Sequence, residues 1–317
     1  MLLPFNLLKL EKMIKLFKVK AVTFGEVLWD VFPTHKKIGG APLNVALRMK
    51  SFGAESTIIS KVGSDVDGEE IVSYLSEKGI DTDIIQVSEE YKTGVVNVMI
   101  NEKGNASYDI LYPSAWDKIA LNEDIKKKVS DADVFIFGSL ICRDEESRST
   151  LKALLEEAKY KVFDVNLRAP YYTTDVLVEL MMKADFIKLN DEELFEISRK
   201  LDSPYNSFEQ NIKFIADKTN TKQVCVTKGA FGAVLYYNEK FYYNSGYFIK
   251  VVDTVGAGDS FLASLIVRLL RGKSPQKSLN YACAIGALVA GEEGANPKIS
   301  EKVISDYMKI EKKGIKK

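Results

Sequence analysis

The chain carries a glycine-rich turn that includes carboxylates and leads into an apolar helix pattern, Asp253-Thr254-Val255-Gly256-Ala257-Gly258-Asp259. Glycines let the backbone approach a ligand closely, and the free N–H groups at a helix start bind anions. A carboxylate beside an anion site repels phosphate. Its presence there is explained if its role is to take a proton from an attacking hydroxyl. The turn therefore predicts phosphoryl transfer, with Asp259 as base and Gly256, Ala257 and Gly258 around the phosphate. An Asp that caps a structural turn is the alternative.

Polar residues also follow other predicted strands. Gly39-Gly40-Ala41-Pro42-Leu43-Asn44 opens a helix that Gly53 ends, and Pro42 suits the first helical position. Asp164, Asn166 and Arg168 close one strand, and Asn190-Asp191-Glu192-Glu193 opens a helix directly after another. Open α/β sheets bind ligands beyond the carboxyl ends of their strands, so we expect these groups to lie at one edge of a sheet.

A sheet with helices between its strands is needed to bring these residues together. Short apolar runs predict strands at Val19–Phe24, Ser56–Val62, Val134–Phe137, Lys161–Asp164, Phe186–Leu189 and Gln223–Thr227. Helical patterns lie between several of them, at Gly68–Glu77, Glu145–Ala158, Val176–Lys183 and Phe208–Lys218. The alternation predicts βα units with a parallel sheet. After Thr227 we expect a hairpin, Ala233–Tyr237 with Lys240–Tyr243, and then helices at Asp259–Arg271 and Pro275–Ala290.

One region breaks this alternation. Thr93–Ile100 and Ser107–Tyr112 flank a turn rich in Gly and Asn at residues 101–105, which predicts an antiparallel hairpin. Together with Leu28–Pro33, this hairpin can form a small second sheet that projects from the core.

Composition excludes several classes of protein. The chain has 317 residues, is 46% hydrophobic and holds 44 Lys and Arg against 44 Asp and Glu, which predicts a globular protein without nucleic-acid or membrane partners. Three scattered cysteines indicate a reducing compartment without structural zinc, and the single His35 rules out a multi-histidine metal site. The apolar start lacks a basic region and a cleavage site, so we expect a cytoplasmic protein in which residues 1–18 are an extension and 19–317 the fold.

The two motifs identify the chain as similar to the ribokinase-like (PfkB) sugar kinases. Gly39 to Asn44 and Asp253 to Asp259 stand in the family's order, and the resemblance runs from about Val19 to Pro297. Gly25-Glu26-Val27-Leu28-Trp29-Asp30 and Pro113-Ser114-Ala115-Trp116-Asp117 make it most like the fructokinases. The resemblance implies a three-layer α/β/α core with a mostly parallel sheet, and a small β-sheet lid made by about 28–38 and 93–113. It also implies ATP and Mg²⁺ as cofactors.

The resemblance assigns roles by position. The sugar side comprises Asp30, Gly40, Asn44, Ala115, Trp116, Asp164, Asn166 and Arg168. The nucleotide side comprises Asn190, Glu193, Thr227, Lys228, Gly229, Gly256, Gly258, Asn280, Ala284 and Ala287. Glu193 would act on Mg²⁺ through water, and Asp253 with Val255 would hold a monovalent cation such as K⁺.

Structural alternatives remain open for three of these groups. The acidic helix start at Asn190 is also favoured by the helix dipole alone. Trp116 is equally well explained as a core residue, and the small residues around Ala284 suit tight helix packing as well as an adenine base.

The activity implied is transfer of the γ-phosphate of ATP to a primary hydroxyl of a ketohexose, fructose to fructose 6-phosphate. Ribose, 2-keto-3-deoxygluconate or a nucleoside is the alternative substrate, because Val165 replaces a frequent Pro and Ala106 a frequent basic residue. A sensor without catalysis is a further alternative, against which Asp259 argues. A homodimer through the lid is also implied. A Rossmann dehydrogenase is excluded because no Gly-x-Gly-x-x-Gly follows the first strand.

Overall fold

The computed structural model describes residues 18–100 and 106–314. Residues 1–17 of the predicted extension and the predicted turn at 101–105 lie outside the described residues. The main sheet has eight strands in the order β14-β13-β12-β11-β10-β9-β1-β4. Their bounds are β1 Lys20–Phe24, β4 Glu55–Ile59, β9 Val134–Gly138, β10 Lys161–Asp164, β11 Phe186–Asn190, β12 Gln223–Thr227, β13 Ala233–Tyr237 and β14 Lys240–Asn244. The first six in the chain are parallel, and β13 and β14 form an antiparallel hairpin at one edge.

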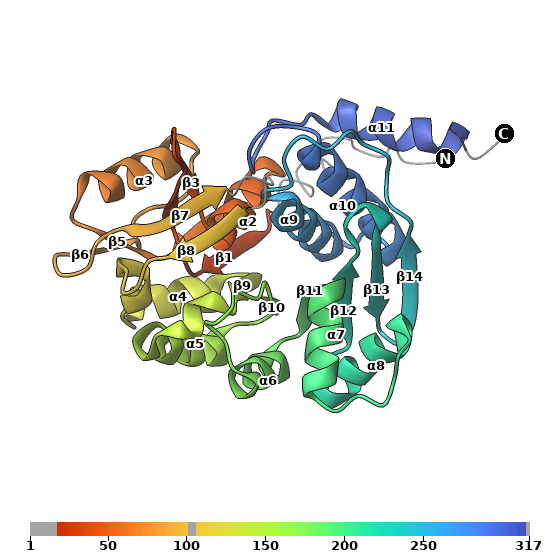
Figure 1. Cartoon of the computed structure of the whole chain (residues 1–317), viewed down its shortest axis with the longest axis horizontal. Helices are drawn as coiled ribbons and strands as arrows, with labels where there is room; N and C mark the ends of the chain where they lie inside the picture. The colour runs from red at the N-terminus through yellow and green to blue at the C-terminus, as the bar shows by residue number, and fades with distance from the viewer. Residues whose placement is uncertain (1–17, 101–105, 315–317) are drawn as a thin grey trace, which may run out of the picture.

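Helices cover both faces of this sheet, so the predicted three-layer α/β/α core is confirmed (Figure 1). On one face pack α4 Glu123–Asp131, α5 Glu145–Glu157, α6 Thr174–Lys183, α7 Asp191–Lys200 and α8 Phe208–Thr219. On the other face pack α2 Ala41–Ser51, α9 Ala257–Leu270 and α10 Pro275–Ala290, and α11 Glu301–Gly314 lies against α10. Side chains alternate between the layers: Phe135 and Phe137 of β9 face the first group, and Val134 and Ile136 face the second.

Most element boundaries lie within two residues of the predictions, and two differences concern the site and the path of the chain. The run Ser56–Val62 is two strands, because the chain leaves the main sheet after Ile59 and pairs β5 Lys61–Gly63 with β6 Gln86–Ser88. The helix expected from Asp259 begins two residues earlier, at Ala257. Helices α4 and α11 were outside the predicted set. In α4 only Ile125 and Val129 are buried, so its apolar periodicity is too sparse to see in the sequence.

A second sheet of four strands stands beside the core. Its order is β3-β2-β7-β8, with β2 Leu28–Val31, β3 Lys36–Gly39, β7 Gly94–Ile100 and β8 Ala106–Ile110. The predicted hairpin is therefore present, and β2 joins it by parallel pairing with β7. Helix α3 Val66–Glu77 packs against the outer side of this sheet through Trp29, Ile71 and Leu75 (Figure 1). We call these four strands the lid.

Candidate active site

The glycine turn forms the start of α9. Gly256 is the N-cap residue with a left-handed φ of 72°, and no side chain of the described residues caps this helix. A Cβ on Gly256 would lie 2.5 Å from the Cβ of Ala295, so only glycine fits there. The N–H groups of the first turn are therefore left without side-chain partners, and they can bind an anion. Asp259 occupies the third helical position, so it is not the residue that caps the turn.

Asp259 is held by the helix that follows the Gly39-Gly40 turn. Asn44 Nδ2 donates to Asp259 Oδ2 at 2.9 Å, and Asn44 Oδ1 accepts from Asn296 Nδ2 at 3.0 Å. Burial raises the pKa of Asp259 to about 6, with a further upward contribution from the charge of Asp164. Since that value stays below neutral pH, the carboxylate is mostly ionised there and can accept a proton.

The Gly39-Gly40 turn depends on a carboxyl group that the sequence motifs did not single out. Gly40 has a φ of 116°, and a Cβ on it would collide with the carbonyl oxygen of Glu26. Glu26 is 5% exposed, and its Oε1 accepts a hydrogen bond of 3.2 Å from the N–H of Ala41 at the start of α2. Burial raises its pKa to about 7. A buried Glu directly after an apolar strand is the signal that identifies such a residue.

The charge of Arg168 acts on Asp30 of the lid. Asp30 lies on β2 of the lid, where its carboxyl group fills the space that a Cβ on Gly39 would need. Burial raises the pKa of Asp30 to about 6, and the positive charge of Arg168 opposes this shift. The positive charge of Arg168 also opposes the upward shifts that burial causes in the pKa of Glu26 and of Asp259. One exposed guanidinium therefore acts on three carboxyl groups from different elements.

A small cavity adjoins these carboxyl groups. Asp164 and Asn166 line it from the end of β10, together with Glu26 and residues 136–140. Asp164 pairs with Lys188 of the neighbouring strand, with 2.9 Å between Oδ1 and Nζ. Lys188 was absent from the predicted site, although a Lys inside the apolar run Phe186-Ile187-Lys188-Leu189 demands a buried partner.

Asn190 and Glu193 form a reciprocal cap at the start of α7. The N–H of Glu193 donates to Asn190 Oδ1, and the N–H of Asn190 donates to Glu193 Oε2, both at 2.8 Å. Glu193 Oε1 accepts from the N–H of Leu167 at 2.8 Å. Both carboxylate oxygens thus accept one backbone hydrogen bond each, which fixes the orientation of the Glu193 side chain. Within the described residues no cluster of three or more His, Cys, Asp or Glu can hold a metal.

The predicted nucleotide residues lie around the ends of β12 and α10. Thr227 ends β12, and Gly229 follows with a φ of 52°. Asn280 Oδ1 accepts from Asn244 at 3.0 Å and from Gln276 at 2.8 Å. Ala284 is fully buried, so its assignment to the nucleotide is wrong and its small side chain serves helix packing.

Three other predicted residues are Asp253, Lys228 and Ala287. Asp253 accepts from the N–H of Val255 at 3.0 Å and from that of Gly294 at 3.1 Å, so it joins the glycine turn to the segment after α10. Lys228 extends toward Phe208, with Nζ 5.5 Å from the ring centre. Ala287 is partly exposed on α10.

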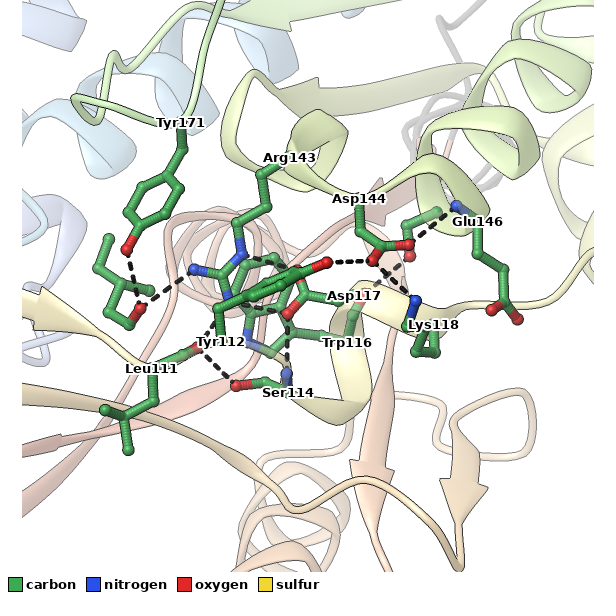
Figure 2. A network of polar contacts seen from close by, with 12 residues as sticks. Leu111, Tyr112, Ser114, Trp116, Asp117, Lys118, Arg143, Asp144, Glu146 and Tyr171 are labelled. Atoms are coloured by element: carbon green, nitrogen blue, oxygen red, sulfur yellow. Dashed lines mark hydrogen bonds and ion pairs between the residues drawn. The ribbon is translucent and has the colours of Figure 1, made fainter.

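Of the two interpretations left open for Trp116, the structure supports the core residue, and Ala115 is buried with it. Both residues are 0% exposed, and the Trp116 ring packs under the guanidinium of Arg143 with its centre 4.1 Å away (Figure 2). A Cβ on Gly94 would lie 2.5 Å from Trp116 Nε1, so the backbone of Gly94 packs closely against the nitrogen edge of the indole. Trp116 is therefore a core residue at the base of the lid.

Comparison with known proteins agrees with this arrangement. A model described as pfkB family carbohydrate kinase matches residues 11–302. The chain belongs to the pfkB family of carbohydrate kinases. Its relatives include the sugar kinase PH1459 of Pyrococcus horikoshii, 31% identical over 84% of this chain and 85% of that protein, and fructokinase-2 of Solanum habrochaites, 29% identical over 88% and 92%.

Solved structures of related kinases share the fold. PH1459 in complex with ATP superposes with a TM-score of 0.76 at 29% identity, covering 87% of this chain and 93% of that one. The 2-dehydro-3-deoxygluconokinase of Thermotoga maritima has a TM-score of 0.80 at 22% identity, covering 92% and 99%. The kinase family is therefore secure, and relatives with different sugar substrates share the architecture. Across 18–100 and 106–314, no helix has the length and apolar character needed to cross a membrane.

Proposed function

We propose that this carbohydrate kinase transfers the γ-phosphate of ATP to a primary hydroxyl of a ketohexose, converting fructose to fructose 6-phosphate. The observation that carries the proposal is Asp259, held by Asn44 beside the open N–H groups of the glycine turn. One residue of this arrangement belongs to the sugar-side helix and the other to the phosphate-side helix. A hydroxyl bound against Asn44 thus lies next to both a base and an anion site.

In the proposed reaction, Asp259 accepts the proton of the attacking hydroxyl as the new O–P bond forms and the bond to the leaving ADP breaks. The N–H groups of Gly256, Ala257, Gly258 and Asp259 stabilise the charge on the transferred group. Asp30 and Arg168 bind sugar hydroxyls, because a carboxylate accepts hydrogen bonds and a guanidinium donates them. The lid carries Asp30 and, once closed over the sugar, keeps water from the γ-phosphate.

Mg²⁺ bound to ATP neutralises phosphate charge during transfer. Glu193 would hold it through water, because Mg²⁺ sheds its hydration reluctantly and usually keeps several waters. Asp253 and the carbonyl of Val255 would hold a monovalent cation, and each Asp253 oxygen keeps one lone pair beyond its backbone hydrogen bond.

The test is ATP consumption against fructose, other ketoses, aldoses, nucleosides and 2-keto-3-deoxygluconate. Fructose is expected to give the highest kcat/KM. A higher kcat/KM for 2-keto-3-deoxygluconate would make that sugar acid the substrate in place of fructose. The exposed positive charge of Arg168 favours this second candidate, because 2-keto-3-deoxygluconate carries a carboxylate. If no substrate causes ATP consumption while the protein still binds the nucleotide, the result would support a sensor without catalysis.

The homodimer through the lid stays a prediction. Met99 and Tyr108 on the lid strands are 55% and 60% exposed, which leaves apolar surface for a second copy. Light scattering of the purified protein, with and without Tyr108→Asp, decides whether the lid mediates dimerisation.

A further inference from the structure

Lys188 and Asp164 are direct neighbours in the main sheet. They are paired positions in the parallel register of β10 and β11. Their side chains point to the face that also carries Val162 and Phe186, which is the face that α9 covers. The Nζ–Oδ1 distance is 2.9 Å, and the two side chains are 9% and 6% exposed. The register therefore buries one ion pair between the sheet and the catalytic helix.

The ammonium group lies directly beneath the glycine turn. A Cβ built on Gly258 would be 3.4 Å from Lys188 Nζ, so no atom separates the charge from the turn's backbone. Asp164 is the only hydrogen-bond acceptor of this ammonium in the described part of the chain, although an ammonium has three N–H donors. Asp164 Oδ2, in turn, has no hydrogen-bond partner there. The pair is buried and incompletely satisfied.

Charged groups from several elements surround Asp259. Asp164 on β10 raises its pKa, whereas Lys188 on β11, Arg168 after β10 and the hydrogen bond from Asn44 on α2 lower it. The negative charge of Asp259 in turn raises the pKa of Glu26, at the end of β1. Lys188 itself remains charged, since the negative charges of Asp164, Glu193 and Asp259 raise its pKa.

We propose that Lys188 is a positioning residue of the phosphoryl-transfer site, which fixes a positive charge beneath the glycine turn, and that Asp164 holds this charge in place. A fixed charge in a buried site needs no reorganisation when the phosphoryl group arrives. The same charge keeps Asp259 in the ionised form that accepts a proton. The inference rests on the proposed role of Asp259 and adds the residue that maintains it.

The test measures the protonation of Asp259 in variants of the pair. Carbon-13 NMR of labelled aspartate carboxyls follows the titration, and Asp259→Asn identifies the signal. Lys188→Met is expected to shift the Asp259 midpoint upward by about one pH unit, because an attractive charge is lost. Asp164→Asn is expected to shift it downward, because a repulsive charge is lost. The double variant Asp164→Asn/Lys188→Met is expected to fall between the two single variants, and Lys188→Arg to stay near the unmodified protein.

The acid limb of kcat against pH must move in the same directions. The matched control is Asp117→Asn/Arg143→Met, which removes another buried ion pair and is expected to leave the Asp259 midpoint unchanged. If Lys188→Met does not fold, the Asp259 midpoints of Asp164→Asn and of the double variant still test the inference. Coinciding midpoints in all folded variants overturn the inference. Absence of sugar kinase activity overturns the proposed function instead, because the NMR titration needs no substrate.

Discussion

Two buried ion pairs in this protein differ in how completely they are hydrogen-bonded. Arg143 and Asp117 are 2% and 0% exposed, and Arg143 binds both Asp117 oxygens at 2.7 and 2.8 Å. Arg143 also donates to the carbonyls of Ile110 and Leu111 at the end of the lid hairpin (Figure 2). Lys188 and Asp164 share a single contact of 2.9 Å, and one carboxylate oxygen has no partner among the described residues.

The difference separates a fully hydrogen-bonded ion pair from an incompletely satisfied one. The Arg143–Asp117 pair satisfies its donors and acceptors, so it stabilises the base of the lid and has no capacity left for a ligand. The Lys188–Asp164 pair leaves charge unsatisfied next to the phosphate-binding turn, which costs stability and suits a site that must accept charge from a reactant.

The largest effect is expected from breaking the satisfied pair. Arg143→Met leaves Asp117 buried without its partner, so we expect a loss of about 3–5 kcal/mol in the free energy of unfolding. The lid hairpin also loses its two backbone anchors, so KM for sugar should rise while ADP affinity holds. Urea denaturation and calorimetry measure these quantities. Arg199→Met is the matched control, at an exposed Arg whose side chain donates to the Phe195 carbonyl. A stability change no larger than in that control would refute the structural role.

The next largest effect is expected at Asp259, whose pKa the charges of Lys188 and Asp164 influence. Asp259→Asn should lower kcat by at least ~10²-fold, the lower end for a general base, with little change in ADP affinity. Its thermal midpoint at pH 7 should not fall. Burial raises the pKa of Asp259 from 3.8 to about 6, so its ionisation opposes folding progressively between those values and fully above them. Near-normal turnover at saturating sugar would remove Asp259 from the role of base.

A smaller effect is expected at the link between the sugar helix and Asp259. Asn44→Ala should weaken fructose binding by ~1–3 kcal/mol, because a hydroxyl of the bound sugar loses its partner. ADP binding should be unchanged, and titration calorimetry compares the two ligands. Asn122→Ala removes the N-cap of α4 far from the site and controls for a general loss of stability. Equal losses for both ligands would indicate disruption of α2 instead.

The smallest effect is the pH dependence near neutrality. Because Asp259 must be ionised and its pKa is about 6, kcat should fall by about tenfold per pH unit below that value. Between pH 7 and 6 the loss should be only about twofold. Steady-state rates across this range, at saturating fructose and ATP, give the acid limb. A flat profile down to pH 5 would show that Asp259 is not titrating in the rate-determining step.

The sequence located the reactive turn, the Gly39-Gly40 turn and most of the strands because each rests on local patterns. Glycines and an acid before an apolar helix are visible in one short segment, and apolar runs predict buried strands wherever they occur. The lid hairpin was visible for the same reason. Trp116 and Ala284 were left undecided, because a residue beside a motif can face either a ligand or the core and local sequence does not distinguish the two; the structure buries both.

The sequence by itself determined the α/β class, the order of most elements and the place of the glycine turn at the start of a helix. Only the tertiary structure decided which charges meet. Asp164 and Lys188 are 24 residues apart, and they pair because two parallel strands adopt one register. Asn44 reaches Asp259 across 215 residues because α2 and α9 pack on the same face of the sheet. Such contacts depend on strand register and helix packing, which are set by the burial of the whole core and not by the residues that meet.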